Sequence, residues 1–322
     1  MKKILLVLIT ALLMAGILSG CSHQENPDDD KKLQIVTTIF PVYDWVMNVL
    51  SDNPGNAEVT MLLDTGADLH SYQPTAADMM KITSADIFVY VGGESDEWVE
   101  DVLKNSSGDR CIVMNLMEIL TDRLREEELV EGMEHDHEEE EEETEYDEHI
   151  WLSLRNAAVR VKRIEEALSK ADSVNAAVYQ NNRTSYIQKL DDLDRQYQTA
   201  VTQASVKTLL FADRFPFRYL TEDYGLNYYA AFAGCSAESE ASFEIVTFLA
   251  RKVDELNLKA VLTIEGTDHR IAETVIRTTA SGNQKILTLN SLQSVTAREV
   301  AQGISYLTVM AENLKVLKEA LR

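Results

Sequence analysis

Positive charge is scarce in this sequence. Lysine and arginine together number 30 against 54 aspartates and glutamates, which gives a formal net charge of −24. A chain this acidic offers no basic stripe to neutralise phosphates, so nucleic acid is excluded as a partner. The imbalance is concentrated between Glu126 and His149, where 15 residues are acidic and none is Lys or Arg.

Familiar catalytic motifs are also missing. The chain has no Gly-x-Ser-x-Gly elbow, no Gly-x-Gly-x-x-Gly turn after a strand and no His-Glu-x-x-His helix. A zinc hydrolase would need a general base beside an open coordination position, and no motif supplies that base. The sequence therefore predicts a protein that is not an enzyme.

No apolar run is long enough for a comfortable membrane span, which needs roughly 20 residues. The longest, Ile4 to Leu18, follows two lysines and fits the core of a signal peptide. It ends in the residues LSGC, which resemble the lipobox of bacterial lipoproteins, so residues 1–20 are predicted to be removed and Cys21 to carry lipid. The polar segment 21–32 then forms a tether on the extracytoplasmic face of the cell membrane. A secretory signal followed by an ordinary cysteine is the alternative.

Cysteine is scarce as well, because only Cys111 and Cys235 remain after Cys21. Outside the membrane these two thiols could pair. The sequence alone does not show whether their Cα atoms come within range of a disulfide. A bridge and two free thiols therefore both stay open.

From Leu33 onward, short β-branched and aliphatic runs alternate with helical patterns. This alternation predicts an α/β fold with parallel sheets covered by helices. We expect a first doubly wound lobe over residues 33–176, with an acidic loop at 126–148, and a second over 205–322. Residues 177–204 are expected to form one rigid linking helix, since Val178 to Ala204 contains neither Gly nor Pro.

Two of the six histidines stand at positions suited to ligands. His70 follows the second predicted strand, at the edge of a parallel sheet where open α/β folds bind ligands. A surface histidine in a polar loop is the alternative there. His149 lies between the acidic loop and a helix, beside Trp151 and Leu152, which would hold its imidazole still as a metal ligand needs.

Other donor side chains follow strands in the second lobe. Asp213 and Arg214 come at the end of an apolar strand, where they could form an ion pair or support a loop. Glu265, Asp268 and His269 follow a later strand. These strand ends are again ligand-binding positions.

Together these motifs resemble the zinc/manganese solute-binding lipoproteins of bacterial ABC importers, of the cluster A-I type and its zinc-type branch. Residues 68–75, DLHSYQPT, are close to the family pattern Asp-Pro-His-x-Tyr-x-Pro-Thr. Residues 147–156, DEHIWLSLRN, are close to Asp-Pro-His-x-Trp-Leu-(Asp/Ser)-Pro-x-Asn. Tyr179, Asn182 and Tyr186 match the start of the family's linker helix, and the resemblance covers essentially the whole chain.

The resemblance implies one cation in a cleft between two lobes, with His70 and His149 as its best-supported ligands. The third family ligand, a His or Glu, aligns with Arg214, which has no lone pair to give. A shift of one residue makes Asp213 the candidate. For the fourth ligand the best match is Asp268, with Glu265 and His269 as alternatives.

Two imidazoles with one or two carboxylates suit Zn²⁺ or Mn²⁺. We favour zinc because the resemblance associates a His-rich acidic insertion before the second ligand with zinc proteins. His135 and His137 in this acidic loop are candidate auxiliary ligands, and a loop that only solvates is equally consistent with its composition.

The resemblance therefore implies a monomeric, lipid-anchored binding protein that hands a divalent metal to an ABC permease and its ATPase subunit. A surface adhesin or structural lipoprotein with a degenerate metal site is the alternative. The departure at Arg214 keeps that alternative open.

Overall fold

The computed structural model describes residues 32–51, 57–104, 111–133, 145–236 and 240–322. The predicted signal peptide and nearly all of the tether, with Cys21 and His23, lie outside these ranges, as do His135 and His137. Within the ranges described, no helix combines the length and apolar character needed to cross a bilayer.

The first lobe is built on a parallel four-stranded sheet in the order β2-β1-β3-β4. Its central strands are rich in buried aliphatic residues, as expected of a parallel sheet with helices on both faces. The strands are β1 (Leu33–Thr37), β2 (Ala57–Met61), β3 (Ile87–Tyr90) and β4 (Ile112–Asn115).

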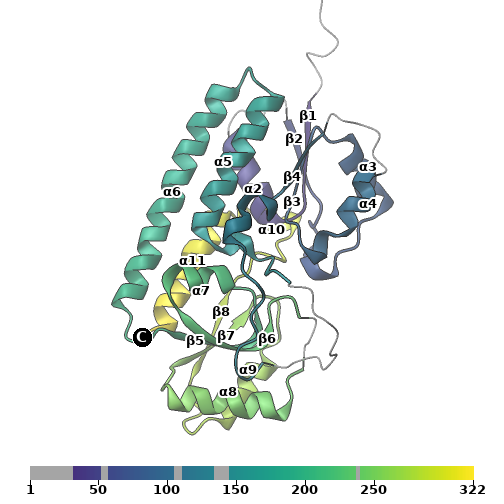
Figure 1. Ribbon diagram of the computed structural model, residues 1–322. Helices are drawn as coiled ribbons and strands as arrows, with labels where there is room; N and C mark the ends of the chain where they lie inside the picture. The colour runs from purple at the N-terminus through teal and green to yellow at the C-terminus, as the bar shows by residue number, and fades with distance from the viewer. Residues whose placement is uncertain (1–31, 52–56, 105–110, 134–144, 237–239) are drawn as a thin grey trace, which may run out of the picture. The chain divides into compact units, whose positions relative to one another are not determined.

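Helices cover both faces of this sheet: α3 (Ala76–Ser84) and α4 (Trp98–Lys104) lie on one, and α2 (Phe40–Leu50) and α5 (Leu154–Ala171) on the other (Figure 1). The start of α3 is fixed by a capping box between Thr75 and Asp78. The loop between β2 and this cap carries His70.

A hairpin of two long helices follows the first lobe. The α5 helix begins at Ser153, whose hydroxyl accepts a hydrogen bond from the Asn156 amide at 3.0 Å. Its partner, α6 (Ala176–Gln203), runs 28 residues without a break. Six side chains at helical spacing form its buried face: Tyr179, Tyr186, Leu190, Leu193, Tyr197 and Val201.

The second lobe repeats the first, with a parallel sheet in the order β6-β5-β7-β8. α8 and α9 pack on one face of it, and α11 packs on the other (Figure 1). Its elements are β5 (Thr208–Phe215), α7 (Arg218–Tyr224), β6 (Asn227–Ala233), α8 (Phe243–Glu255), β7 (Ala260–Ile264), α9 (Arg270–Thr278), β8 (Lys285–Leu289), α10 (Ala297–Ala301) and α11 (Tyr306–Ala320). The prediction of two doubly wound α/β lobes joined by one long helix is confirmed.

The two sheets share one hydrophobic core that includes buried residues of α2, α5, α6 and α11. Polar contacts reinforce it: Trp151 Nε1 donates to the Ser291 carbonyl at 2.8 Å, and the Tyr306 hydroxyl donates to the Trp151 carbonyl at 2.6 Å. The segment just after His149 is therefore fastened to the second lobe.

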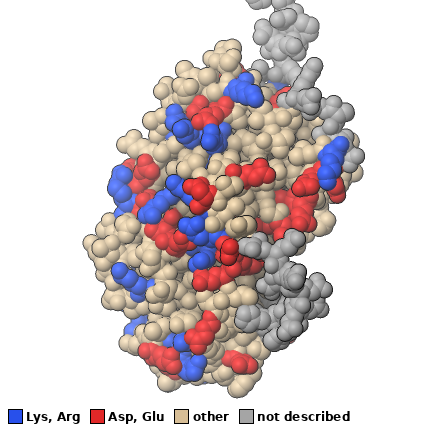
Figure 2. Space-filling view, viewed as in Figure 1, with Lys and Arg blue, Asp and Glu red and all other residues tan. Residues whose placement is uncertain are grey.

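Charged residues on the surface are mixed in sign. On the face in Figure 2, Lys and Arg occur in small groups beside Asp and Glu. Ion pairs between residues three or four apart in one helix, such as Arg163 with Glu166 at 2.9 Å, give groups of this kind.

Candidate metal centre

His149 is the more rigidly held of the two candidate imidazoles. It precedes a short 3₁₀ turn, η4 (Ile150–Leu152), and its side chain is 0% exposed. Asp147 Oδ1 accepts from both the backbone amide and Nδ1 of His149, at 2.8 and 3.0 Å. Because the carboxylate only accepts, Nδ1 directs its proton to Asp147, and Nε2 is the ring nitrogen that can bind a metal.

His70 lies on another short turn, η1 (Leu69–Ser71), in the loop after β2. Asp68 caps this turn by accepting from the His70 amide at 3.1 Å. His70 Nδ1 lies 2.8 Å from Ser95 Oγ, in the short turn η2 (Glu94–Asp96) that follows β3. The Ser95 hydroxyl can therefore hold the ring with its Nε2 turned inward.

The two rings face each other through their Nε2 atoms, which are 3.2 Å apart. Two nitrogens that both bind a tetrahedral zinc, each about 2.05 Å from the ion, lie about 3.3 Å apart. The pair thus has the separation that a shared zinc ion requires. The structure brings together the two histidines that the sequence ranked first, and their assignment as ligands stays a prediction.

The surroundings of His70 favour a neutral His70 ring and a negative Asp68 carboxylate. Burial, together with the neighbouring His149, lowers the pKa of His70 to about 3. Burial opposes ionisation of Asp68, but the hydrogen bond and charge of Arg214 outweigh it and hold the pKa of this carboxyl below its usual value. Neutral imidazoles beside an ionised carboxylate are the forms that bind a divalent cation.

Two further side chains that sequence reasoning missed lie beside the imidazoles. The sulfur of Cys235, in the loop after β6, and one ring nitrogen of each histidine lie within 4.8 Å of one another. Gln293, after β8, is buried beside His149; with its amide nitrogen turned to Asp68, its oxygen accepts from His149 Nε2 at 2.6 Å. Nε2 must release that proton to bind a metal. Both residues follow strands of the second sheet, and that position is the one feature of the sequence that could have indicated them.

Cys235 is one of two free thiols in the described chain, the other being Cys111. Burial raises the pKa of the Cys235 thiol, and the negative charges of Glu127 and Asp147 act in the same direction. Without a metal this thiol is therefore protonated at neutral pH.

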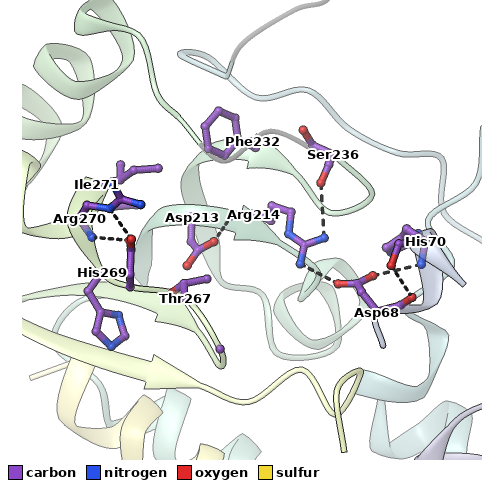
Figure 3. A pocket seen from close by; sticks show the side chains of 14 residues that line it. Asp68, His70, Asp213, Arg214, Phe232, Ser236, Thr267, His269, Arg270 and Ile271 are labelled. Carbon is purple, nitrogen blue, oxygen red and sulfur yellow. Dashed lines mark hydrogen bonds and ion pairs between the residues drawn. The ribbon is translucent and has the colours of Figure 1, made fainter. Parts of the chain in front are cut away.

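Arg214 points toward the first lobe and not toward the imidazoles' shared space. Its Nη2 donates to Asp68 Oδ2 at 2.8 Å, and its Nη1 donates to the Ser236 carbonyl at 3.4 Å (Figure 3). Arg214 thus forms its ion pair with Asp68, whereas the sequence left open an ion pair or a loop-supporting role for Asp213 and Arg214.

Three of the remaining candidate ligands, Asp213, Glu265 and Asp268, have other partners. A cavity of about 540 Å³ extends from His70 to His269, and His269 and Arg270 lie at the end away from His70 (Figure 3). Asp213 lines it, but its carboxylate accepts from the Ile264 and Arg214 amides at 3.1 and 2.9 Å. Asp268 is exposed and pairs with Arg270.

Glu265 is engaged as well, because both of its oxygens accept from Ser291, each at 2.7 Å. Among the described residues, none of the second-lobe candidates Asp213, Glu265, Asp268 and His269 belongs to the group formed by the two imidazoles and Cys235.

Two α/β lobes with a facing imidazole pair beyond the ends of their parallel strands define a two-lobed binding protein of the solute-binding type. The chain belongs to the family described as zinc-uptake complex component A, periplasmic, whose model matches residues 35–320. The family predicted from the motifs, the metal-binding solute-binding proteins of ABC importers, is confirmed.

Among its relatives is the zinc-binding lipoprotein AdcA of Streptococcus pneumoniae, 34% identical over 320 residues, which are 99% of this chain and 61% of AdcA. The chain thus spans about three fifths of the streptococcal relatives. It is 30% identical to the high-affinity zinc uptake system protein ZnuA of Bacillus subtilis over 98% of this chain and 97% of that protein.

The Zn(II)-bound ZnuA-like domain of S. pneumoniae AdcA is a similar solved structure. Its TM-score is 0.71 at 30% identity, over 90% of this chain and 99% of that domain. A laminin-binding adhesin of Streptococcus agalactiae has a TM-score of 0.74, covering 90% of this chain and all of that one, but is 23% identical. That likeness shows the fold alone.

Proposed function

We propose that this protein captures Zn²⁺ outside the cytoplasmic membrane and delivers it to an ABC permease, whose ATPase subunit drives import. The observation that carries the proposal is the pair of Nε2 atoms 3.2 Å apart, on a buried and a partly buried imidazole, a separation suited to a tetrahedral zinc ion. The zinc-binding names of the relatives AdcA and ZnuA support the same ion. The zinc is cargo, so the protein performs no reaction on it.

We further propose that the mature protein is a monomer anchored by lipid on Cys21. Residues 21–32 would serve as the tether, 33–176 and 205–322 as the lobes and 177–204 as the linking helix. The lipobox-like residues before Cys21 and the description of AdcA as a lipoprotein support the anchor. The permease and its ATPase are the partners that such a position requires.

Zinc titration of the protein by calorimetry tests the proposal. We expect one site of submicromolar affinity, weakened more than about 100-fold in His70→Ala and in His149→Ala, since loss of a ligand exceeds the cost of losing an outer hydrogen bond. His269→Ala is the matched control, because His269 lines the same cavity outside the imidazole pair. Absence of zinc binding, or equal binding by all three variants, would overturn the proposal.

A further inference from the structure

We propose that the thiolate of Cys235 is the third ligand of the bound ion, taking the role that the resemblance assigns to a residue at the end of β5. The inference rests on the proposed function, since it concerns the same imidazole pair. It gives the site a donor set of two imidazole nitrogens and one sulfur.

The loop that carries Cys235 is built against the ring of His149. A Cβ on the preceding residue, Gly234, would lie 3.0 Å from His149 Cε1 and 2.9 Å from the Phe215 carbonyl oxygen. Only glycine permits this approach without displacing a neighbour. On the other side, the Cys235 amide donates to Glu127 Oε1 at 3.2 Å, which fixes the loop to the first lobe.

The distances require only a small adjustment on metal binding. A zinc-bound sulfur and a zinc-bound nitrogen, at about 2.3 and 2.05 Å from a tetrahedral ion, lie about 3.6 Å apart. The sulfur of Cys235 is already within 4.8 Å of the ring nitrogens of both histidines. A movement of about 1 Å in one short loop is enough to complete the coordination.

Arg214 explains why the ligand comes from the next strand. It occupies the position where a metal-binding His or Glu is expected, and a guanidinium has no lone pair for a metal. It bridges Asp68, which caps the His70 turn, and the carbonyl of Ser236, which follows Cys235. Arg214 therefore acts as a positioning residue that holds the thiol loop beside the His70 turn.

Binding of zinc by Cys235 exchanges a proton and a water molecule for the metal–sulfur bond. The S–H bond of Cys235 breaks and its proton passes to solvent, while the sulfur forms a bond to zinc in place of one water of the hydrated ion. The fourth position falls to the Gln293 amide oxygen or to a retained water. A thiolate favours zinc and other borderline or soft ions over Mn²⁺, which prefers oxygen donors.

Cobalt substitution tests the sulfur ligand directly. The reduced protein is titrated with Co²⁺ and its near-ultraviolet spectrum is recorded, because thiolate coordination adds a sulfur-to-cobalt charge-transfer band. We expect the band in the wild-type protein and in Cys21→Ser and Cys111→Ser, and its loss in Cys235→Ser. In parallel, zinc affinity should fall at least about tenfold in Cys235→Ser and remain unchanged in the other two thiol variants.

The possible results separate this inference from the proposed function. If the wild type binds zinc through His70 and His149 but shows no charge-transfer band, and Cys235→Ser keeps full affinity, the sulfur ligand is refuted and zinc capture stands. If the wild type binds no zinc, both fail. Cys235→Ala, with its metal-free melting temperature as a folding check, must reproduce the Cys235→Ser result for the inference to hold.

Discussion

At the scale of single residues, Asp147 fixes the orientation of the His149 ring, which we propose as a zinc ligand. Its Oδ1 accepts from Nδ1 of the ring, and its own carbonyl accepts from the Tyr219 hydroxyl at 2.7 Å. We expect Asp147→Asn to weaken zinc binding by about 10- to 100-fold, because the amide no longer fixes the ring and its tautomer as the carboxylate does. Competition with a chromophoric zinc chelator measures the change.

Asp192→Asn is the matched control for this change, since Asp192 is exposed on α6 and pairs only locally with Arg195. Equal zinc affinity in Asp147→Asn and Asp192→Asn would show that the hydrogen bond to His149 does not orient the ligand.

Substitution of Asp213 and Asp268 distinguishes two ligand sets. The motifs predict both carboxylates as ligands, whereas the structure favours His70, His149 and Cys235. Since both carboxylates have other partners, we expect Asp213→Asn and Asp268→Asn to retain the zinc affinity of the wild type. The measurement is the same chelator competition, with His70→Ala as the positive control. A tenfold loss in either variant would support the four-ligand set predicted from the motifs.

The sequence predicted the histidines but not their neighbours, for a definite physical reason. His70 and His149 each lie in a short continuous motif, so they can be found from neighbouring residues alone. Asp213 was placed by counting along β5, yet the pairing of β5 with β6 shifts register between Phe211 and Arg214. Such an irregularity re-aims side chains, and the Asp213 carboxylate turns to the β7 amide of Ile264.

Cys235 and Gln293 were missed because their approach to His149 is a tertiary property. It depends on how the loops after β6 and β8 lie against His149, which precedes Cys235 by 86 residues and Gln293 by 144. No local pattern in the sequence encodes those contacts.

At the scale of elements, most of the fold was predictable from apolar periodicity. The buried stripe of α6 is the one expected from Tyr186, Leu190, Leu193, Tyr197 and Val201. The strands were also recognisable, because buried strands leave short apolar runs rich in β-branched residues. The short turns η1 and η4, which carry the site, were not predictable, because turns of three residues have no periodicity to detect.

A buried carboxyl connects three of these helices. Asp44 Oδ2, on α2, accepts from the Tyr186 hydroxyl of α6 and the Tyr306 amide of α11, each at 3.2 Å. Burial raises the pKa of Asp44 from 3.8 to about 6, although these hydrogen bonds oppose the rise. The folded state therefore holds the proton more tightly than the unfolded chain does.

The sign of the resulting pH dependence follows from that difference. The cost of the buried charge is absent below about pH 4, grows as pH rises to about 6 and is complete above it. At about 1.4 kcal/mol per pH unit it reaches roughly 3 kcal/mol. Urea unfolding should show the stability of Asp44→Asn relative to wild type rising by up to about this amount from pH 4 to pH 7.

An exposed change, Asp192→Asn, should leave the stability difference from wild type nearly constant over the same range. A constant difference for Asp44→Asn as well would mean that Asp44 is ionised as easily in the folded protein as in the unfolded chain.

At the scale of the whole described chain, the two lobes are fastened to each other by packing between α2 and α11 and by one shared core. The rings of Trp45 on α2 and Tyr306 on α11 pack edge to face, with their centroids 5.3 Å apart. One buried cluster contains residues of both sheets. Wide hinge closure would break this packing, whereas a shift of the loops carrying His70 and Cys235 would not. Metal binding and release are therefore expected to involve small local movements.

Zinc should accordingly stabilise the protein without compacting it. At a free zinc concentration 100 times the dissociation constant, binding adds about 2.7 kcal/mol to the free energy of unfolding. For a chain of this size that raises the melting temperature by about 4 °C. The small-angle scattering curves with zinc and with a chelator should superimpose, and His149→Ala should show no thermal shift. A clear fall in radius of gyration on zinc addition would instead mean that the helix pair α5–α6 and the shared core permit the lobes to close around the ion.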